Sequence, residues 1–398
     1  MKIVRDPIHG YIEISDEVLP IVSSPFFQRL RYISQTALAY MVYPGMRHTR
    51  FEHSLGAMHL AKEFLNFISF EKKVDFINED YKTLVSVSAL LHDVGHLAFS
   101  HTFESALQVA KEVYGLNVEY YGKETHVKFG LRLIEKYSYM FDKLGKNSNI
   151  SDPVKFLLHV IGSNPKTEEE RFASKIISNF IDADRGDYLL RDSYYAGVDY
   201  GSYDIERLKR VLVYVDDKIA VLKKAIPIVE QFLLARMYMF ENVYFHSVVG
   251  MYNAILSHAI ADLLLKEKID LQDIERITDY RIMSLIEETE YRDPILFREG
   301  YKRIKKDITQ ECFSKIDKNE LIELMRETKG KVIYYEFFDA PYSEANEAVY
   351  IYDGEKVSQL SRFSSIITSI KELQKGIIVY HKSMEDKVKK YEEILKSC

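Results

Sequence analysis

Apolar residues recur at three- and four-residue spacing over most of the first 265 residues, and this spacing is typical of amphipathic α-helices. The first clear stretch begins at Ser24-Pro25, where a proline is tolerated in the first turn of a helix. We therefore predict a largely helical core. Its main helices are expected at Phe26–Tyr40, Phe51–Phe67, Lys82–Leu91, Ile177–Leu190 and Ile226–Leu265.

The pattern changes after residue 265, where runs rich in aromatic and β-branched residues alternate with turn signals. Asp353-Gly354, directly after one such run, favours a β-hairpin turn. The predicted fold is mainly α, with a helical core over residues 1–265 and a smaller mixed α/β lobe over residues 266–398 packed on it. Strands are expected at Lys331–Phe338, Ala348–Tyr352 and Gly376–His381, a short strand with a turn at Ile3–Ile14, and a closing helix at Met384–Lys396.

Size and charge fit this organisation. The chain has 398 residues, of which 47% are apolar, and this is enough for a sizeable core and a second lobe. The formal net charge is −6, which argues against a protein that coats nucleic acid. A local basic pocket for one phosphorylated ligand remains compatible with that charge.

Cysteine usage and hydropathy indicate a soluble, cytoplasmic protein. Cys312 and Cys398 are the only cysteines and neither belongs to a C-x-x-C pair, so we expect no disulfide scaffold and no thiolate zinc site. The first residues lack the apolar core of a signal peptide. The most apolar long stretch, Ser247–Leu265, is interrupted by Asn253 and Asp262, and we interpret it as a buried helix, with no membrane partner.

Histidines are concentrated in one part of the chain. Seven of the twelve lie within residues 48–126, although a single histidine on a helix is usually a core or surface residue. The strongest segment is LLHDVGHLAFSH, residues 90–101, in which an adjacent histidine and aspartate follow an apolar helical run. An imidazole nitrogen and a carboxylate oxygen placed side by side can reach one divalent cation. The polar titratable groups of this segment are His92, Asp93, His96 and His101.

A metal needs further ligands, and two other segments offer them. His53 lies in RHTRFEHSLG at the start of a predicted helix, and Asp184 lies in DADRGDYLLRD. Asp184 taken alone would more often be a helix cap or a surface acid. A set of two imidazoles and two carboxylates suits Mn, Fe, Co, Ni, Zn or Mg better than a thiol-seeking metal.

Arginines cluster in the same segments, at Arg47, Arg50, Arg185 and Arg191. Guanidinium groups suit phosphate oxygens, although solvated helix faces or ion pairs with nearby aspartates would also account for them. A metal, arginines and spare histidines together indicate cleavage of a phosphoester or phosphoanhydride, in which a histidine moves the proton. The sequence has no P-loop, no G-x-S-x-G elbow and no dinucleotide fingerprint.

Several motifs in succession resemble those of the HD-domain superfamily, and within it the deoxynucleoside triphosphate (dNTP) triphosphohydrolases. The resemblance covers roughly the first 250 residues, and the C-terminal lobe resembles the family only loosely. The motifs are DPIHGYIEI (6–14), SPFFQRLRYISQ (24–35), YPGMRHTRFEHSLG (43–56), LLHDVGHLAFSH (90–101), DADRGDYLLRDSYYAG (182–197) and ARMYMFENVYFH (235–246).

The resemblance implies roles for individual residues. The metal ligands would be His53, His92, Asp93 and Asp184. The active-site histidines near the α-phosphate would be His96, His101 and His126, with His101 as proton donor to the leaving 5′-oxygen. Glu104 stands where the family usually has the aspartate that orients this donor.

The same resemblance implies how a nucleotide would be held. Contacts to the triphosphate and substrate would come from Arg50, Arg185, Arg236 and Tyr244. Contacts to the sugar would come from Gln35, Tyr188 and Asp192. A tyrosine packed against C2′ would exclude a ribose hydroxyl and so select deoxynucleotides.

The implied reaction converts a dNTP to a deoxynucleoside and inorganic triphosphate by attack of a metal-bound hydroxide on the α-phosphate. The implied cofactor is Mn, Fe, Ni, Co or Zn, alone or with Mg, and the implied assembly is a homodimer or larger. Relatives bind an activating nucleotide between subunits. Gln28 and Arg31 match that site, but Ser23 replaces its guanine-reading aspartate and Arg5 replaces a neutral polar residue. A guanine-specific activator is therefore not predicted, and other regulation stays open.

Two alternative functions also stay open. The first is an HD phosphohydrolase acting on another nucleotide or phosphoester, because one fold hosts several such reactions. The differences at residues 5, 23 and 104 leave room for it, whereas the matched sugar contacts favour a dNTP. The second is a catalytically silent nucleotide sensor or nucleic-acid-binding protein. The intact ligand set and the acidic net charge argue against this second alternative.

Overall fold

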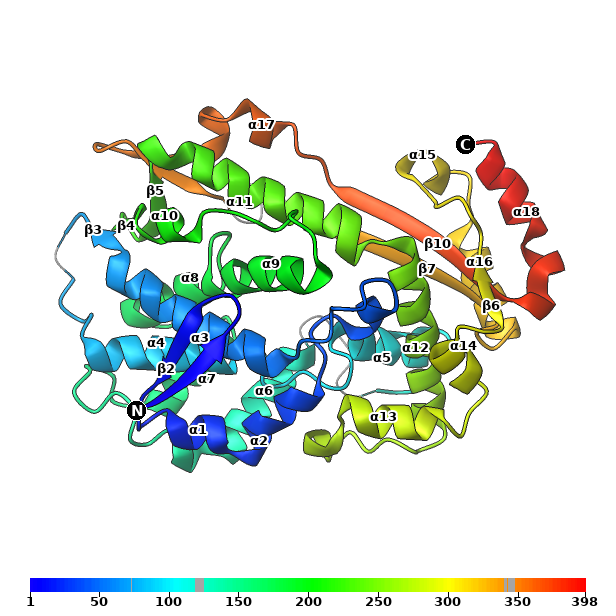
Figure 1. The fold of residues 1–398 in the computed structure, drawn as a ribbon, viewed down its shortest axis with the longest axis horizontal. Coiled ribbons are helices and arrows are strands. Elements are labelled where there is room, and N and C mark those ends of the chain that lie inside the picture. The colour runs from blue at the N-terminus through cyan, green and yellow to red at the C-terminus, as the bar shows by residue number, and fades with distance from the viewer. Residues whose placement is uncertain (73, 119–124, 340–341, 343–347) are drawn as a thin grey trace.

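The computed structural model describes residues 1–72, 74–118, 125–339, 342 and 348–398, and its fold is mainly helical (Figure 1). Helices from the first 265 residues pack around one large hydrophobic core. Three small β-sheets accompany them in the described part of the chain. The prediction of a mainly α fold with a smaller mixed C-terminal region is confirmed.

The helices and strands have the following bounds. The α-helices up to residue 265 are α1 (Leu19–Ser23), α2 (Pro25–Gln28), α3 (Arg50–Phe67), α4 (Glu79–Leu91), α5 (His101–Glu112), α6 (Thr125–Lys136), α7 (Pro153–Ile161), α8 (Glu168–Ile177), α9 (Ala183–Ala196), α10 (Ile205–Lys209), α11 (Ile226–Met239) and α12 (Ser247–Leu265). Those after it are α13 (Asp279–Ile286), α14 (Arg292–Phe297), α15 (Gln310–Phe313), α16 (Lys318–Glu327), α17 (Ser365–Thr368) and α18 (Glu385–Lys396). The strands are β1 (Lys2–Asp6), β2 (Gly10–Ile14), β3 (Ser69–Phe70), β4 (Leu212–Val215), β5 (Lys218–Leu222), β6 (Tyr301–Arg303), β7 (Val332–Asp339), β8 (Tyr350–Tyr352), β9 (Val357–Gln359) and β10 (Leu373–His381).

Polar caps decide where the central helices begin. The side chain of Asn78 accepts a hydrogen bond from the Tyr81 amide (2.9 Å) at the start of α4, and Asp182 accepts one from the Arg185 amide (2.6 Å) at the start of α9. Such caps satisfy amides that the first helical turn leaves without partners. Because α3 packs against both α4 and α9, these starting points determine which side chains meet between the three helices.

Sheet pairing joins the end of the chain to its middle. The five-stranded sheet has the order β3-β4-β5-β8-β9, so strands from residues 350–359 extend a sheet begun by residues 69–70 and 212–222. The predicted hairpin turn at Asp353-Gly354 is confirmed, since β8 and β9 pair antiparallel around it and Gly354 has φ +105°. In the second sheet, the long strands β7 and β10 run side by side (Figure 1).

Hydrophobic packing crosses the predicted lobe boundary at residue 265. The large core includes residues of nearly every helix in the first 265 residues, and also Ile333 and Phe337 from β7. A second, smaller cluster lies between the β6-β10-β7 sheet and helices α15, α16 and α18. Within the described residues, α12 is the one helix that is long and apolar enough to span a membrane, judged by length and composition alone. Of its apolar stretch, 78% is buried inside the fold, as in the core helix of a globular protein.

The predicted helix at Phe26–Tyr40 is wrong in its middle. Helix α2 ends at Gln28, and a 3₁₀ turn continues it to Tyr32. An extended stretch follows, and a second 3₁₀ segment occupies Ala37–Met41. The amide of Gln35 donates to the carbonyl of His48 (3.1 Å), and the amide of Arg50 donates to the carbonyl of Ile33 (2.9 Å). Backbone pairing with a distant segment thus replaces the helical hydrogen bonds that the apolar spacing predicted.

Two other helical predictions need correction. The segment Ile177–Leu190 is not one helix, because α8 ends at Ile177 and α9 begins only after the cap at Asp182. Ile226–Leu265 is divided into α11 and α12 by a π-helical turn at Phe240–Tyr244. The region expected to be helical also contains β3, β4 and β5, whose short apolar runs have no distinctive helical period.

Close backbone packing follows the turn after α4. A Cβ added to Gly95 would lie 2.0 Å from the carbonyl oxygen of His126 and 2.2 Å from the amide nitrogen of Gly130. A Cβ added to Gly130, across the same contact, would lie 3.4 Å from its nearest neighbour, which is ordinary contact. Gly95 therefore lets α6 approach the turn that carries His92 and Asp93.

We predict that Gly95→Ala lowers the free energy of unfolding by about 3 kcal/mol or more, because backbone atoms cannot move aside as a side chain can. Gly130→Ala should change it by less than about 1 kcal/mol, since alanine is the better helix former. Chemical denaturation of the two variants measures both values. Equal effects of the two substitutions would contradict this account of the contact.

Candidate metal centre and active site

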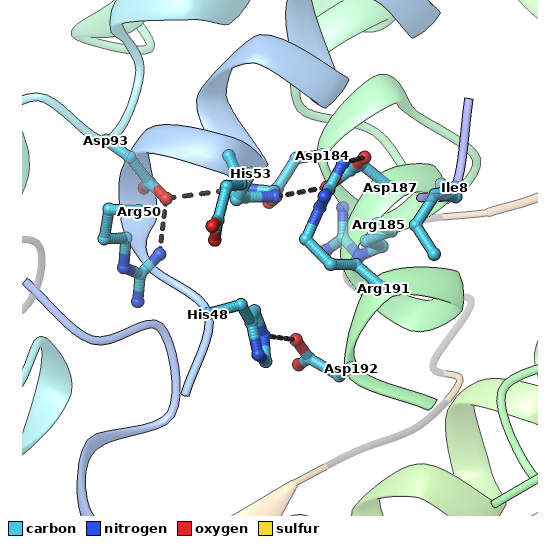
Figure 2. Close-up of polar contacts among 12 residues, drawn as sticks. Ile8, His48, Arg50, His53, Asp93, Asp184, Arg185, Asp187, Arg191 and Asp192 are labelled. Carbon is cyan, nitrogen blue, oxygen red and sulfur yellow. Dashed lines mark hydrogen bonds and ion pairs between the residues drawn. The ribbon is translucent and has the colours of Figure 1, made fainter. Parts of the chain in front are cut away.

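Four side chains from α3, the end of α4 and α9 converge inside the helical core, and Figure 2 labels three of them, His53, Asp93 and Asp184. His53 points from α3, His92 and Asp93 directly follow the last residue of α4, and Asp184 lies in the first turn of α9. The side chain of His53 is fully buried and that of Asp184 is about one-third exposed. The structure thus brings together the four residues that the sequence predicts as metal ligands.

Hydrogen bonds set the orientation of both imidazoles. Nδ1 of His53 donates to Oδ2 of Asp187 (2.8 Å), and Nδ1 of His92 donates to the carbonyl of Ala89 (2.7 Å). Each ring therefore presents Nε2 as its free nitrogen, which is the arrangement that second-sphere partners give to metal-bound histidines. Both Nε2 atoms are buried and neither has a hydrogen bond from any described residue.

The distances between the ligand atoms suit one ion. Nε2 of His53 lies 3.0 Å from Oδ1 of Asp184 and 3.4 Å from Oδ2 of Asp93. Nε2 of His92 lies 3.4 Å from Oδ1 of each aspartate. With bonds of about 2.0–2.1 Å to a metal, neighbouring ligand atoms are about 2.9–3.4 Å apart in tetrahedral or octahedral geometry. The buried nitrogens without partners and this spacing fit a divalent metal.

Electrostatics at this position favour positive charge. Burial alone would lower the pKa of His53, but the nearby carboxylates of Asp184 and Asp187 outweigh it and raise the pKa to about 10. The pKa of His92 is also raised, against burial, by Asp93 and Asp184. Burial opposes ionisation of Asp184, yet the two histidines hold its pKa well below the usual range. A divalent cation satisfies the same carboxylates and leaves the imidazoles neutral.

Arg50 holds Asp93 in place. Its Nη1 forms a short ion pair with Oδ2 of Asp93, and its Nε donates to Oγ of Ser100 (2.9 Å). Nη2 lies 3.4 Å from the carbonyl oxygen of Gln35. The buried guanidinium thus contacts Asp93, Ser100 and Gln35 through its three nitrogens. These contacts position the predicted metal ligand Asp93. The triphosphate contact predicted for Arg50 stays a prediction.

A second polar cluster lies beside the ligands and is organised by Glu104 on α5. Its Oε2 accepts a hydrogen bond from Nδ1 of His101 (2.8 Å), and its Oε1 accepts one from Nδ1 of His126 on α6 (2.7 Å). Burial opposes its ionisation, but these two hydrogen bonds lower the pKa of Glu104. The glutamate that replaces the family's aspartate therefore reaches His101, and it orients His126 as well.

His96 connects the two clusters. Its Nε2 lies 3.3 Å from Oδ1 of Asp93, and its ring stacks on that of His126 at 4.1 Å with an interplanar angle of 8°. Burial lowers the pKa of His96, and the charges of Arg50 and His126 lower it further, so this imidazole is neutral. A neutral imidazole between Asp93 and His126 can accept or pass on a proton.

Two of the residues predicted to hold the sugar, Tyr188 and Asp192, lie on α9 and form a third group with partners from other segments. Both carboxylate oxygens of Asp192 are engaged, one by His48 (2.6 Å) and one by the hydroxyl of Tyr244 (2.7 Å). The hydroxyl of Tyr188 accepts a hydrogen bond from Nη1 of Arg236 (2.8 Å). His48, to which the sequence assigned no role, thus belongs to this group.

Arg236 also contacts the C-terminal region. Its Nη2 donates to both carboxylate oxygens of Asp339, the last residue of β7, at 2.8 and 3.0 Å. Its Nε is buried and has no hydrogen-bond partner in the described part of the chain. The arginine predicted to bind phosphate is therefore paired with a carboxylate that the sequence did not single out.

Four predicted contact residues remain: Arg185, Gln35, Gln28 and Arg31. Arg185 forms short contacts with Asp182 and the carbonyl of Asn179, which direct it toward the start of α9. Oε1 of Gln35 is buried and, among the described residues, has no hydrogen-bond partner. Of the predicted activator residues, Arg31 donates to Gln28 on its own turn (2.9 Å).

Asp187 orients the predicted metal ligand His53, a contact that the sequence does not predict. It accepts hydrogen bonds from His53, from His9 of the N-terminal hairpin (2.7 Å) and, through both oxygens, from Arg191 (2.8 Å each). Arg191 also donates to Asp6 (2.8 Å). The i,i+4 spacing of Asp187 and Arg191 predicts an ion pair, but nothing in the sequence shows that its carboxylate also orients a metal ligand.

Comparisons with known proteins place these features in a family. The chain matches the HD domain over residues 50–191 and the HD associated region over residues 203–395. The associated region begins at residue 203, before the predicted boundary between the helical core and the C-terminal lobe at residue 265. That boundary stays a prediction. An uncharacterised protein of Methanocaldococcus jannaschii is 34% identical over 387 residues, which are 93% of this chain and 76% of that protein.

Two further similarities extend this result. A Dictyostelium discoideum protein named deoxynucleoside triphosphate triphosphohydrolase SAMHD1 homolog is 31% identical over 277 residues, which are 68% of this chain and 52% of that protein. The chain thus spans about half the length of that relative. The crystal structure of a hypothetical protein from Aquifex aeolicus has a TM-score of 0.78 at 29% identity and covers 98% of this chain and 99% of that one. The chain therefore belongs to the HD-domain superfamily of metal-dependent phosphohydrolases.

Proposed function

We propose that this protein hydrolyses a deoxynucleoside triphosphate to a deoxynucleoside and inorganic triphosphate. The observation that carries the proposal is the position of Asp93, whose carboxylate lies within 3.4 Å of Nε2 of both ligand histidines and of His96. Groups able to move protons therefore lie directly beside the proposed metal ligands. The similarity to a relative named as a dNTP triphosphohydrolase supports the choice of substrate.

Each cluster has a separate task in this reaction. A divalent metal held by His53, His92, Asp93 and Asp184 would polarise a phosphoryl oxygen and lower the pKa of water. His101 would donate a proton to the leaving 5′-oxygen, because its side chain is 68% exposed while Glu104 orients Nδ1. The ionised Glu104 also stabilises the protonated imidazole until the proton leaves. Tyr188 would lie against C2′ of the sugar.

The first prediction concerns the products. Metal-loaded protein incubated with each dNTP and each NTP, with and without the other nucleotides as activators, should release deoxynucleoside and inorganic triphosphate from dNTPs. Ion chromatography identifies the inorganic product. Release of orthophosphate, or of pyrophosphate together with a nucleoside monophosphate, would contradict cleavage of the bond between the α-phosphorus and the 5′-oxygen. Protein stripped of metal by a chelator is the control and should release neither.

The second prediction concerns the metal. Asp184→Asn should lower metal affinity and kcat/KM by at least about 100-fold, because it removes a charged ligand. Loss of a residue that only hydrogen-bonds to a metal ligand already lowers metal affinity or activity by about 10–100-fold. Asp182→Asn, two residues earlier, is the matched control and should retain metal, because asparagine caps helices as well as aspartate. Elemental analysis of both purified proteins measures the metal content. A full metal complement in Asp184→Asn would remove this residue from the ligand set.

The third prediction concerns the sugar. Tyr188→Ala should reduce the preference for a dNTP over the matching NTP, measured as the ratio of kcat/KM values, by at least about 10-fold. Tyr188→Phe keeps the ring and loses only the hydrogen bond from Arg236, so its preference should stay within about 3-fold of the wild type. If both variants lose selectivity equally, the hydroxyl and not the bulk of the ring excludes the ribose.

A further inference from the structure

The turn that leads into α5 has an unusual backbone. Phe99 and Ser100 are consecutive residues with φ of +58° and +54°, and His101 is the first residue of the helix that follows. Residues with a Cβ rarely adopt this left-handed region, and two in succession persist only where surrounding contacts impose them. The strained turn directly precedes the proposed proton donor. Its conformation therefore fixes the backbone position from which the His101 side chain projects.

A carboxylate from a distant part of the chain holds this turn. Oδ1 of Asp279 accepts a hydrogen bond from the amide of Phe99 (2.7 Å), and Oδ2 accepts one from the amide of Ser34 (2.9 Å). Phe99 is 2% exposed, so without Asp279 its amide would be buried in the fold without a strong acceptor. One side chain thus satisfies two backbone donors from separate segments.

A third contact closes the arrangement around Ser100. Its Oγ donates to the carbonyl of Ser34 (2.6 Å) and accepts from Nε of Arg50 (2.9 Å). Arg50 in turn holds Asp93. The Asp279 carboxylate, the extended segment at Ser34 and the strained turn therefore form one unit. This unit sets the start of α5 relative to the proposed metal ligands.

Asp279 lies outside the HD domain as matched. It is the first residue of α13 and belongs to the HD associated region, whereas the turn that it holds belongs to residues 50–191. Its carboxylate contacts backbone amides and, in the described contacts, none of the proposed catalytic side chains. Its effect on the reaction must therefore pass through the turn.

We propose that Asp279 is a positioning residue of the active site, which holds the left-handed turn at Phe99–Ser100 and thereby aims His101 at the leaving group. The proposal rests on the proposed role of His101 as proton donor. It assigns to the HD associated region a direct part in building the site of the HD domain. It also explains why two residues other than glycine keep a left-handed conformation at this place.

Two variants test the proposal, Asp279→Ala and the milder Asp279→Asn, whose amide can accept from only one of the two backbone donors. Hydrogen exchange of the holoenzyme, followed by mass spectrometry, should be at least about 10-fold faster in peptides spanning residues 97–104 of Asp279→Ala. For dNTP hydrolysis, kcat should fall by about 10–100-fold while KM stays within about 3-fold, because the donor is misplaced and substrate binding is not. Metal content should be unchanged.

Ile286→Val, a substitution of a buried residue on the same helix, is the matched control. It weakens the packing of α13 without touching the carboxylate, so kcat and exchange at residues 97–104 should stay as in the wild type. If Asp279→Ala does not fold, Asp279→Asn should show the same changes at smaller size. An equal loss of kcat in Ile286→Val and the Asp279 variants would reduce the role of Asp279 to general stability and overturn the proposal.

Unchanged exchange at residues 97–104 in the Asp279 variants overturns the proposal, whatever the activity. Faster exchange with unchanged kcat, or a rise in KM alone, also overturns it, because the turn would then not govern the donor. If the wild type releases no triphosphate from any dNTP, the proposed function fails. The exchange measurement still shows in that case whether Asp279 holds the turn.

Discussion

The structure depends on neutralising carboxylates that are buried in the helical core. A buried charge without partners costs several kcal/mol, so the chain must supply a cation or donor for every oxygen. Asp187 is met by Arg191, His53 and His9, and Asp93 pairs with Arg50 and lies 3.3–3.4 Å from ring nitrogens of three histidines, where a cation fits. These partners come from the N-terminal hairpin and from α3, α4 and α9. The metal site therefore forms only when these segments have assembled.

The same requirement joins the two matched regions into one working unit. Arg236 of the associated region donates to the hydroxyl of Tyr188 in the HD domain, and β4 of the associated region pairs with β3 of the HD domain. Asp279 reaches from α13 to the turn before α5. The associated region is thus built into the walls of the site. The match to the Methanocaldococcus jannaschii protein over 93% of the chain includes both regions.

Prediction from the sequence succeeded where the signal is local. The pair His92-Asp93 after an apolar helical run, the helix at α3 and the hairpin turn at Gly354 all depend on neighbouring residues. It failed at Phe26–Tyr40, where periodicity favours a helix but backbone pairing with residues 48–50 wins. It also failed to single out Asp187. An i,i+4 ion pair on a helix does not show which other residues donate hydrogen bonds to the same carboxylate.

The sequence by itself determined the chemical inventory: a mainly helical chain with clustered histidines, aspartates and arginines. This inventory follows from residue type and short-range spacing, whereas the assignment of His53, His92, Asp93 and Asp184 as expected metal ligands follows from the resemblance to the HD-domain superfamily. Only the tertiary structure decided which nitrogen of each imidazole is free, which arginine serves a carboxylate, and that Asp279 and Asp339 belong beside the site. These depend on contacts between residues up to 245 positions apart, and such contacts are set by packing of the whole core.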